Sequence, residues 1–422
     1  MQKTAKFFLF LLVAISFSYS YAQDIPRVRK YLDTLCAPGM NGRSVYGDGE
    51  KKAATFICDR FKEFGYKPFN ENYFQPFNFD INTFPGKVSL ILGKNEMKPG
   101  KDFIVKCNSP AAKGKFKIKF LDTLFYRTEE TRIEFLSSDL STYCVVYDEI
   151  FEKQLEKLPS DFSRKLDESG CLVIIRNKRL TMSVAHAQGH TATFEVLKEK
   201  YDYSAKKMQF EVDAVLQKNY ESQNVCAYIE GTKYQDSILL ITAHYDHLGR
   251  MGKEVYFPGA NDNASGVCMV LELANYYKTH PQKYSVVFIA FGAEEAGLIG
   301  SKYFTEHPLF PLAKIKFMLN LDLLGTGDEG MMVVNGTEYK KQFKLLQDIN
   351  TEKNYLPALR KRGKAANSDH YFFTEKGVPA FFFYTLGGVA AYHDVYDVHQ
   401  TLPLTRFKEV FGLITDFTGR IK

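Results

Sequence analysis

The stretch ILLITAHYDHLG, residues 238–249, joins an apolar run to side chains that can bind a metal ion. Residues 238–243 are almost continuously apolar, which is typical of a strand covered on both faces in a parallel or mixed α/β sheet. His244 and Asp246 follow at once, and residues two apart on an extended backbone lie on the same face. Because α/β sheets bind ligands at the carboxyl ends of their strands, this stretch predicts a fold class and the position of a site.

Three more apolar runs of the same character lie at 286–292, 317–324 and 379–385. Segments in which apolar residues recur at helical spacing separate these runs. They lie at 264–280, 298–307 and 339–352, and a further helical region covers 25–66. The alternation predicts an α/β fold, a mixed and largely parallel sheet flanked by helices.

Four acidic residues lie where these runs end or a helix begins. Asp262 directly precedes a predicted helix, where an acidic residue is commonly an N-cap, although the same turn would present a carboxylate to a metal. Glu294 and Glu295 follow the run at 286–292, and adjacent side chains there point different ways, so one would bind metal while the other faces a bound water. Asp322 interrupts an apolar run, and a buried carboxylate needs a cation or an Arg partner.

The histidines are less distinctive than the acids. His393 and His399 are almost equally plausible ligands by composition, and His247 is interpreted as structural or as a support behind a ligand, rather than as a ligand itself. Two histidines, three acids and one spare carboxylate fit two divalent ions and one activated water. Two Zn²⁺ ions are the expected cofactors, and other divalent ions would also suit so many carboxylates. The chain is therefore interpreted as a metallohydrolase.

The composition excludes some classes of protein. The chain has 422 residues, of which 45% are hydrophobic and 25% charged, as in soluble globular proteins. Its net charge of +6 is spread along the sequence, whereas nucleic-acid binding needs clustered Lys and Arg, so no nucleic-acid partner is expected. The seven cysteines form no CxxC pair and are poor zinc ligands, although one or two disulfides would be possible in an oxidising compartment.

Residues 1–22 have the pattern of a cleaved secretory signal. Lys3 and Lys6 precede the apolar run FFLFLLVAISFS, and a cleavage site is expected at Ala22. The run is too short to span a membrane comfortably, and a retained anchor is the alternative. We therefore expect an exported protein, periplasmic or secreted, with no stable membrane insertion after cleavage.

The chain also changes character in its middle. Residues 109–206 alternate β-like segments with charged connectors and carry none of the acidic and histidine motifs. This range is predicted to be a small, β-rich inserted domain. Residues 23–108 and 207–422 would together form the catalytic domain.

The ordered motifs HYDHLG, DNASG, AEEAGLIGS, NLDLLG, SDHYFF and YHDVYD resemble those of the M28 metallopeptidases, a family of co-catalytic zinc aminopeptidases. The resemblance covers residues 240–400, with a weaker match in NGRSVYGDGEKKAATFICDRF. It implies a zinc exopeptidase fold and peptide substrates. It also implies that the insertion is a protease-associated domain.

The resemblance assigns roles to these residues. His244 and Asp322 would hold one zinc ion, Glu295 and His393 the other, and Asp262 would bridge them. Glu294 would be the general base. Asp246 and Asp369 would lie behind the site, and Tyr392 is the candidate for the tyrosine that steadies the tetrahedral intermediate, since Ala365 occupies the alternative position.

An aminopeptidase that uses a metal-activated water is therefore the expected function, and three alternatives stay open. A glutaminyl cyclase on this scaffold typically has one zinc ion and a Trp-lined pocket, and this chain has no Trp. A carboxypeptidase would need a basic pocket, to which Arg360, Lys361 and Arg362 would contribute. A non-catalytic binding protein would be expected to lose ligands or the base, and all six positions are intact.

Overall fold

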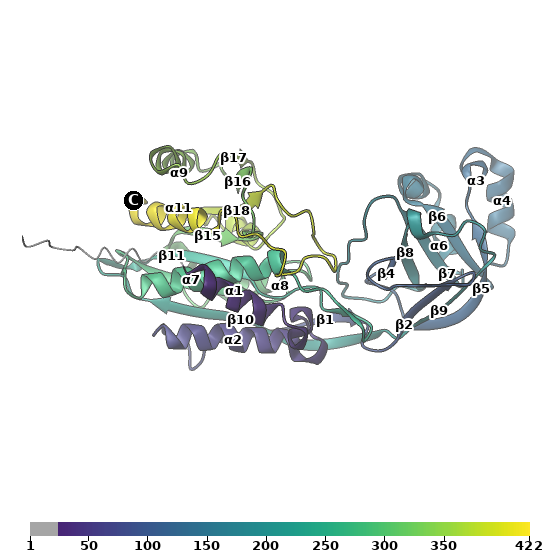
Figure 1. Cartoon of the computed structure of the whole chain (residues 1–422), viewed down its shortest axis with the longest axis horizontal. Helices are drawn as coiled ribbons and strands as arrows, with labels where there is room; N and C mark the ends of the chain where they lie inside the picture. The colour runs from purple at the N-terminus through teal and green to yellow at the C-terminus, as the bar shows by residue number, and fades with distance from the viewer. Residues whose placement is uncertain (1–23) are drawn as a thin grey trace, which may run out of the picture.

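The computed structural model describes residues 24–422 and shows two lobes, each built on its own sheet (Figure 1). The larger lobe holds an eight-stranded sheet in the order β1-β10-β14-β11-β15-β18-β16-β17. Its strands are β1 (Phe74–Thr83), β10 (Val215–Ile229), β14 (Tyr284–Phe291), β11 (Tyr234–His244), β15 (Ile315–Leu321), β18 (Ala380–Leu386), β16 (Gly330–Val334) and β17 (Leu359–Arg362). The four central strands, β14 to β18 in that order, are parallel, and β1, β10 and β16 pair antiparallel to their inner neighbours. The predicted fold class is confirmed.

Helices cover both faces of this sheet. One face packs on α1 (Ile25–Leu35), α2 (Gly49–Glu63), α7 (Gly266–Tyr277), α9 (Lys340–Lys353) and α11 (Phe407–Arg420), and the other on α8 (Ile299–Glu306) and α10 (His370–Glu375). Along β11, Leu239 and Ile241 enter the first of these cores while Ile238 and Leu240 enter the second. Burial on both faces explains why this strand is a continuous apolar run rather than an alternating one.

The second lobe is a mixed sheet in the order β3-β2-β9-β5-β6-β7-β8-β4. Its strands are β2 (Val88–Leu92), β3 (Asn95–Met97), β4 (Phe103–Val105), β5 (Ala112–Phe120), β6 (Tyr143–Asp148), β7 (Cys171–Arg176), β8 (Thr193–Leu197) and β9 (Lys207–Val212). Short helices lie on it, namely α3 (Thr123–Arg127), α4 (Glu129–Ser137), α5 (Glu152–Leu155) and α6 (Ser160–Asp167). A small hairpin of β12 (Arg250–Met251) and β13 (Val255–Tyr256) forms a separate two-stranded sheet.

This second lobe is wider than the insertion predicted at 109–206. Strands β2, β3 and β4 precede that range and β9 follows it, yet all four pair into the second sheet. The β-like character of these segments was visible in the sequence, but nothing there indicates which of two sheets a strand joins. We propose 88–212 as the limits of the inserted lobe.

Two other expectations concern the ends and the cysteines. The predicted signal at 1–22 lies outside the described residues, and in residues 24–422 no helix is long and apolar enough to cross a membrane. All seven cysteines are free thiols in the structure, so the one or two disulfides that the sequence left open are not formed.

Candidate metal centre

The ends of neighbouring strands bring the predicted ligands together. His244 is the last residue of β11, and Asp322 follows β15. Glu294 and Glu295 follow β14, and His393 lies in the loop after β18. Because β14, β11, β15 and β18 are adjacent and parallel, their carboxyl ends converge at one edge of the sheet.

Two clusters of ligand atoms meet on Asp262, which lies in the helical turn η5 (Ala260–Ser265). The Nε2 atom of His244 is 3.3 Å from Asp262 Oδ1 and 3.5 Å from Asp322 Oδ2. The Nε2 atom of His393 is 3.0 Å from Asp262 Oδ2 and 3.1 Å from Glu295 Oε2. Each oxygen of Asp262 therefore faces a different histidine, which is the arrangement that a bridging carboxylate requires.

The side chain of Asp262 does not cap the helix, which was the alternative role considered for it. Asn263 is the capping residue, because its Oδ1 accepts a hydrogen bond of 2.9 Å from the Gly266 amide at the start of α7. The carboxylate of Asp262 faces the two histidines instead.

His393, rather than His399, belongs to the site. The ring of His399 pairs with Asp33 at 2.7 Å, on α1, and His393 contacts Asp262 and Glu295. The sequence could not separate these two histidines, because both lie in one irregular segment after β18.

Glu294 lies close to the His244 cluster. Ligand atoms of Glu294, His244 and Asp322 all lie within 4.8 Å of one another. Burial raises the pKa of Glu294 well above its ordinary value, and the neighbouring carboxylates add to this effect while His244 opposes it. A carboxyl group with a raised pKa is suited to carrying a proton near neutral pH.

The other ligand carboxylates have pKa values pushed in opposite directions. Burial raises the pKa of Asp322 to about 6, against the opposing charge of His244. Burial acts on Glu295 in the same way, but His393 and the hydrogen bond from His247 outweigh it and hold the pKa of Glu295 at about 2. For Asp262, bonds to His244 and His393 likewise overcome burial and lower its pKa well below the ordinary value.

The histidines respond to this negative charge. Burial disfavours their protonated forms, yet nearby carboxylates raise the pKa of His244 well above its ordinary value and that of His393 to about 11. The positive charges of the two protonated rings therefore offset the negative charges of the ligand carboxylates.

The donor set fits divalent metal ions. Among the described residues, no Lys or Arg forms an ion pair with any ligand carboxylate, so the Arg partner considered for Asp322 is not there. Asp322 Oδ1 is also buried with no hydrogen-bond partner in the described chain. Buried carboxylates without cationic side chains are costly unless a metal compensates them, and nitrogen and carboxylate ligands are those that zinc takes.

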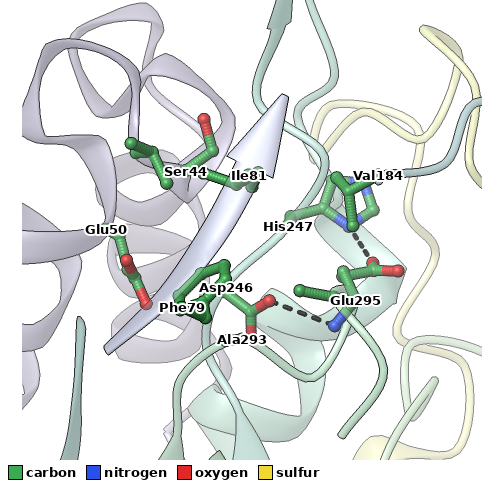
Figure 2. A pocket seen from close by; sticks show the side chains of 11 residues that line it. Ser44, Glu50, Phe79, Ile81, Val184, Asp246, His247, Ala293 and Glu295 are labelled. Atoms are coloured by element: carbon green, nitrogen blue, oxygen red, sulfur yellow. Dashed lines mark hydrogen bonds and ion pairs between the residues drawn. The ribbon is translucent and has the colours of Figure 1, made fainter. Parts of the chain in front are cut away.

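Asp246 holds the loop that carries the two glutamates. Its Oδ1 accepts a hydrogen bond of 3.0 Å from the Glu294 amide. Its Oδ2 accepts one of 3.1 Å from the Glu295 amide (Figure 2). Its contact with the His244 ring is weaker, since His244 Nδ1 is 3.7 Å from Asp246 Oδ1 and 3.3 Å from the Asp246 backbone oxygen. Asp246 thus acts chiefly on the backbone at 294–295.

The remaining predicted residues lie around the same centre. Asp369 is completely buried, and burial raises its pKa to about 7 although the charge of His244 opposes the shift. Tyr392 stacks on the His393 ring with 4.0 Å between the ring centroids. Tyr392, His393, Glu294 and Asp262 line a cavity of about 480 Å³.

Three further residues support the site, and the sequence reasoning missed two of them, Asp397 and Arg43. The Nδ1 atom of His247 lies 2.7 Å from Glu295 Oε1, so His247 orients a ligand, which is one of the two roles considered for it from the sequence. Asp397 accepts hydrogen bonds from the amides of Asn261 and Asp262 at 2.8 and 3.0 Å. The motif YHDVYD contains Asp397, which was the one available signal.

Arg43 is the third of these residues. Its guanidinium is completely buried and donates only to backbone carbonyls, those of Tyr245, Pro258 and Gly259 at 2.6–2.8 Å among them. A weaker bond of 3.3 Å reaches the carbonyl of Asp262. The side chain thus joins the segments that follow β11 and precede α7.

Comparison with known proteins agrees with this geometry. The sequence model of peptidase family M28 matches residues 224–418. Aminopeptidase YwaD of Bacillus subtilis (strain 168) is 33% identical over 175 residues, which cover 38% of this chain and 35% of YwaD. The chain therefore spans about a third of that relative.

Two solved structures share the fold over nearly the whole chain. The aminopeptidase from Aneurinibacillus sp. strain AM-1 has a TM-score of 0.66 and 21% identity, and the alignment covers 95% of this chain and 94% of that one. The zinc aminopeptidase BSAP from Bacillus subtilis has a TM-score of 0.70 and 20% identity over 93% and 94% of the two chains.

Proposed function

We propose that the protein is a two-zinc aminopeptidase of peptidase family M28, whose sequence model matches residues 224–418. The observation that supports the proposal most strongly is the pair of ligand clusters joined through Asp262. The relatives named above are aminopeptidases, and BSAP is a zinc aminopeptidase.

The ligands divide between the two ions. His244 and Asp322 would hold one zinc ion, Glu295 and His393 the other, and Asp262 would lie between them. When bound, the ions would polarise the scissile carbonyl and lower the pKa of a water, so that the water loses a proton readily as it attacks that carbonyl. Other divalent ions would suit the same carboxylate-rich set.

Glu294 is the proposed general base. It would accept a proton from the attacking water and pass it to the leaving amine, which is the kind of step worth about 10²–10⁴-fold in rate. The raised pKa of Glu294 favours its protonated form, which the second half of this task requires. Tyr392 lines the same cavity and would donate a hydrogen bond to the oxygen of the tetrahedral intermediate.

The rest of the cavity suggests how a peptide end would bind. The excess of carboxylates would attract the free α-ammonium group of the substrate. Leu323, Phe382 and Tyr384 line the cavity beside the ligands, and such walls suit an apolar or aromatic side chain at the cleaved residue. Arg360, Lys361 and Arg362 form the edge strand β17, largely exposed, and are absent from this lining, so the proposal favours an amine end over a carboxylate end.

The location and the second lobe complete the proposal. The sequence of residues 1–22 supports export to the periplasm or beyond the cell, with peptides as the substrates met there. The second lobe, residues 88–212, would be a protease-associated domain.

A substrate panel tests the proposed activity. Purified mature protein would be assayed on leucyl- and phenylalanyl-anilides, on the same compounds with blocked amines, and on N-terminal glutaminyl peptides. Cleavage of the unblocked anilides alone is expected. Cyclisation of the glutaminyl peptide, or cleavage only next to a free carboxylate, would contradict the proposal and point to a cyclase or a carboxypeptidase.

A further inference from the structure

One loop of the second lobe crosses to the metal centre. It joins β7 to β8 and covers residues 177–192, which contain no helix or strand. Loops longer than about 12–15 residues without secondary structure are uncommon and usually functional. We refer to residues 179–188 of this loop as the arm.

The arm makes two hydrogen bonds to one ligand residue. The Met182 amide donates to the His393 carbonyl at 2.9 Å, and His393 Nδ1 lies 3.1 Å from the Met182 carbonyl oxygen. A carbonyl can only accept, so in the neutral ring Nδ1 carries the proton. The lone pair then lies on Nε2, which faces Asp262 and Glu295. A second hydrogen bond of this kind fixes the tautomer and orientation of a metal-binding imidazole.

The arm is anchored at both ends. On one side, the side chains of Leu180 and Met182 are buried in the core of the second lobe. On the other side, the two ring nitrogens of His186 lie within hydrogen-bond distance of the carbonyl oxygens of Asp80 and Ala296, and a neutral ring donates to one of them. Ala296 directly follows the ligand Glu295, so the arm touches both segments that carry the proposed second-zinc ligands.

Between these anchors, Val184 packs on the glutamate loop. Its side chain contacts the small apolar cluster formed by Phe77, Ala293 and Ala296. Val184, His247 and Glu295 line one pocket, and Figure 2 shows Val184 beside the other two.

The loop that carries His393 is held by the second lobe at two further points. Arg179 of the arm donates to the Ala390 carbonyl at 3.4 Å, and Val395 packs against the core of the second lobe. His393 itself has φ of 54°, in the left-handed region that residues with a side chain adopt uncommonly. These contacts help to hold this backbone conformation from outside the larger lobe.

We propose that the arm is a positioning element of the metal centre. Met182 orients the ring of His393, so the second lobe takes part in holding the zinc ion at the Glu295–His393 position and has little effect on the ion at His244 and Asp322. The inference rests on the proposed two-zinc function, and it gives the inserted lobe a role in holding the metal.

The release of zinc to an excess of a chromophoric chelator tests this inference. Met182→Pro removes the amide that donates to the His393 carbonyl and so releases the backbone whose carbonyl accepts from the His393 ring. His186→Ala frees the far end of the arm without a change in the buried core. His186→Gln keeps a donor for the Ala296 carbonyl. His190→Ala is the matched control, because His190 is an exposed histidine of the same loop with no contact to the larger lobe among the described interactions.

We expect two release phases in the unmodified protein. In Met182→Pro one phase should be faster by about 10-fold or more, the scale on which such supporting contacts affect metal affinity, while the other phase stays unchanged. His186→Ala should show a smaller acceleration of the same phase, and His186→Gln should largely restore the original rate. His190→Ala should match the unmodified protein, and thermal unfolding would verify that every variant is folded.

Two results would overturn the inference. Release at the original rates from both folded arm variants would show that the arm does not position His393, and equal acceleration of both phases would indicate general loosening. If the unmodified protein binds two zinc ions and cleaves unblocked anilides in either case, the proposed function stands without the inference. If it binds none, both are wrong.

Discussion

At the scale of single residues, the sequence indicated the candidate ligands more clearly than the groups that support them. A carboxylate inside an apolar run, such as Asp322, is visible because it contradicts its surroundings. Asp397 and Arg43 bond backbone amides and carbonyls. Because nearly every residue has these groups, the sequence does not indicate which of them a side chain bonds. The carbonyl of Met182 is the extreme case, since any residue type supplies one.

Replacement of Glu294 tests the assignment of the general base. Glu294→Gln keeps the shape of the side chain but cannot accept a proton, so kcat should fall by about 10²–10⁴-fold while bound zinc is retained. Activity and metal content would be measured on the same sample. A rate near that of the unmodified protein would show that another group takes the proton.

Glu50 gives a prediction on pH. It is 2% exposed in a pocket beside Asp246, and burial followed by the charge of Asp246 raises its pKa to about 8 (Figure 2). Because the folded pKa lies above the ordinary value of 4.5, the stability linked to this proton is complete below about pH 4.5 and is lost as the pH rises to about 8.

Glu50→Gln should remove this dependence. Urea unfolding of both proteins at pH 5, 7 and 8.5 would compare their free energies of unfolding. The variant should gain relative to the unmodified protein as the pH increases. A difference that is constant with pH would mean that Glu50 is ionised in the folded protein throughout.

At the scale of elements, the periodicity and length of the apolar runs identified the four central strands. They did not indicate which of the two sheets each outer strand joins. Strand β2 reads as β-like from its residues, and its pairing with β9, more than a hundred residues later, depends on the whole inserted lobe. The long loop between β7 and β8 has no periodic pattern at all, so nothing in it indicated a contact with His393.

One ion pair adds to the apolar packing of α1 on α7. Arg27 of α1 makes two hydrogen bonds of 2.6 Å to Glu272 of α7, whose side chain is 1% exposed. Arg27→Ala would leave that carboxylate buried and unpaired. The free energy of unfolding should fall by about 2–3 kcal/mol, below the roughly 3–5 kcal/mol of a wholly buried pair because the Arg27 side chain is 31% exposed.

Chemical denaturation with and without the substitution would measure this change. Lys30→Ala is the control, since Lys30 is exposed on the same helix. Metal content should be unchanged in both variants, because α1 supplies no ligand. A loss of stability no larger than in Lys30→Ala would show that the pair does not hold the helix in place.

At the scale of the whole molecule, the sequence predicted an α/β catalytic domain interrupted by a β-rich insertion, and the two lobes have that character (Figure 1). What it did not predict is that the insertion reaches the metal centre. That contact joins residues 211 positions apart, and such distant pairings have no local signal.

Removal of metal should destabilise the entire protein. Without cations, the clustered carboxylates repel one another and the histidines alone balance them. A ligand present at 100 times its Kd stabilises the folded state by about 2.7 kcal/mol, so chelation should lower Tm by a few degrees. Calorimetry with and without chelator, followed by restored zinc, would measure it, and an unchanged Tm would argue against a loaded site.

The most direct test of the central claim is the number of zinc ions per chain in active protein, compared with His393→Ala. The account predicts about two in the unmodified protein and about one in the variant, because the His244 cluster stays complete. A fully active protein with a single zinc ion, or with none, would contradict the two-metal site that Asp262 is proposed to join.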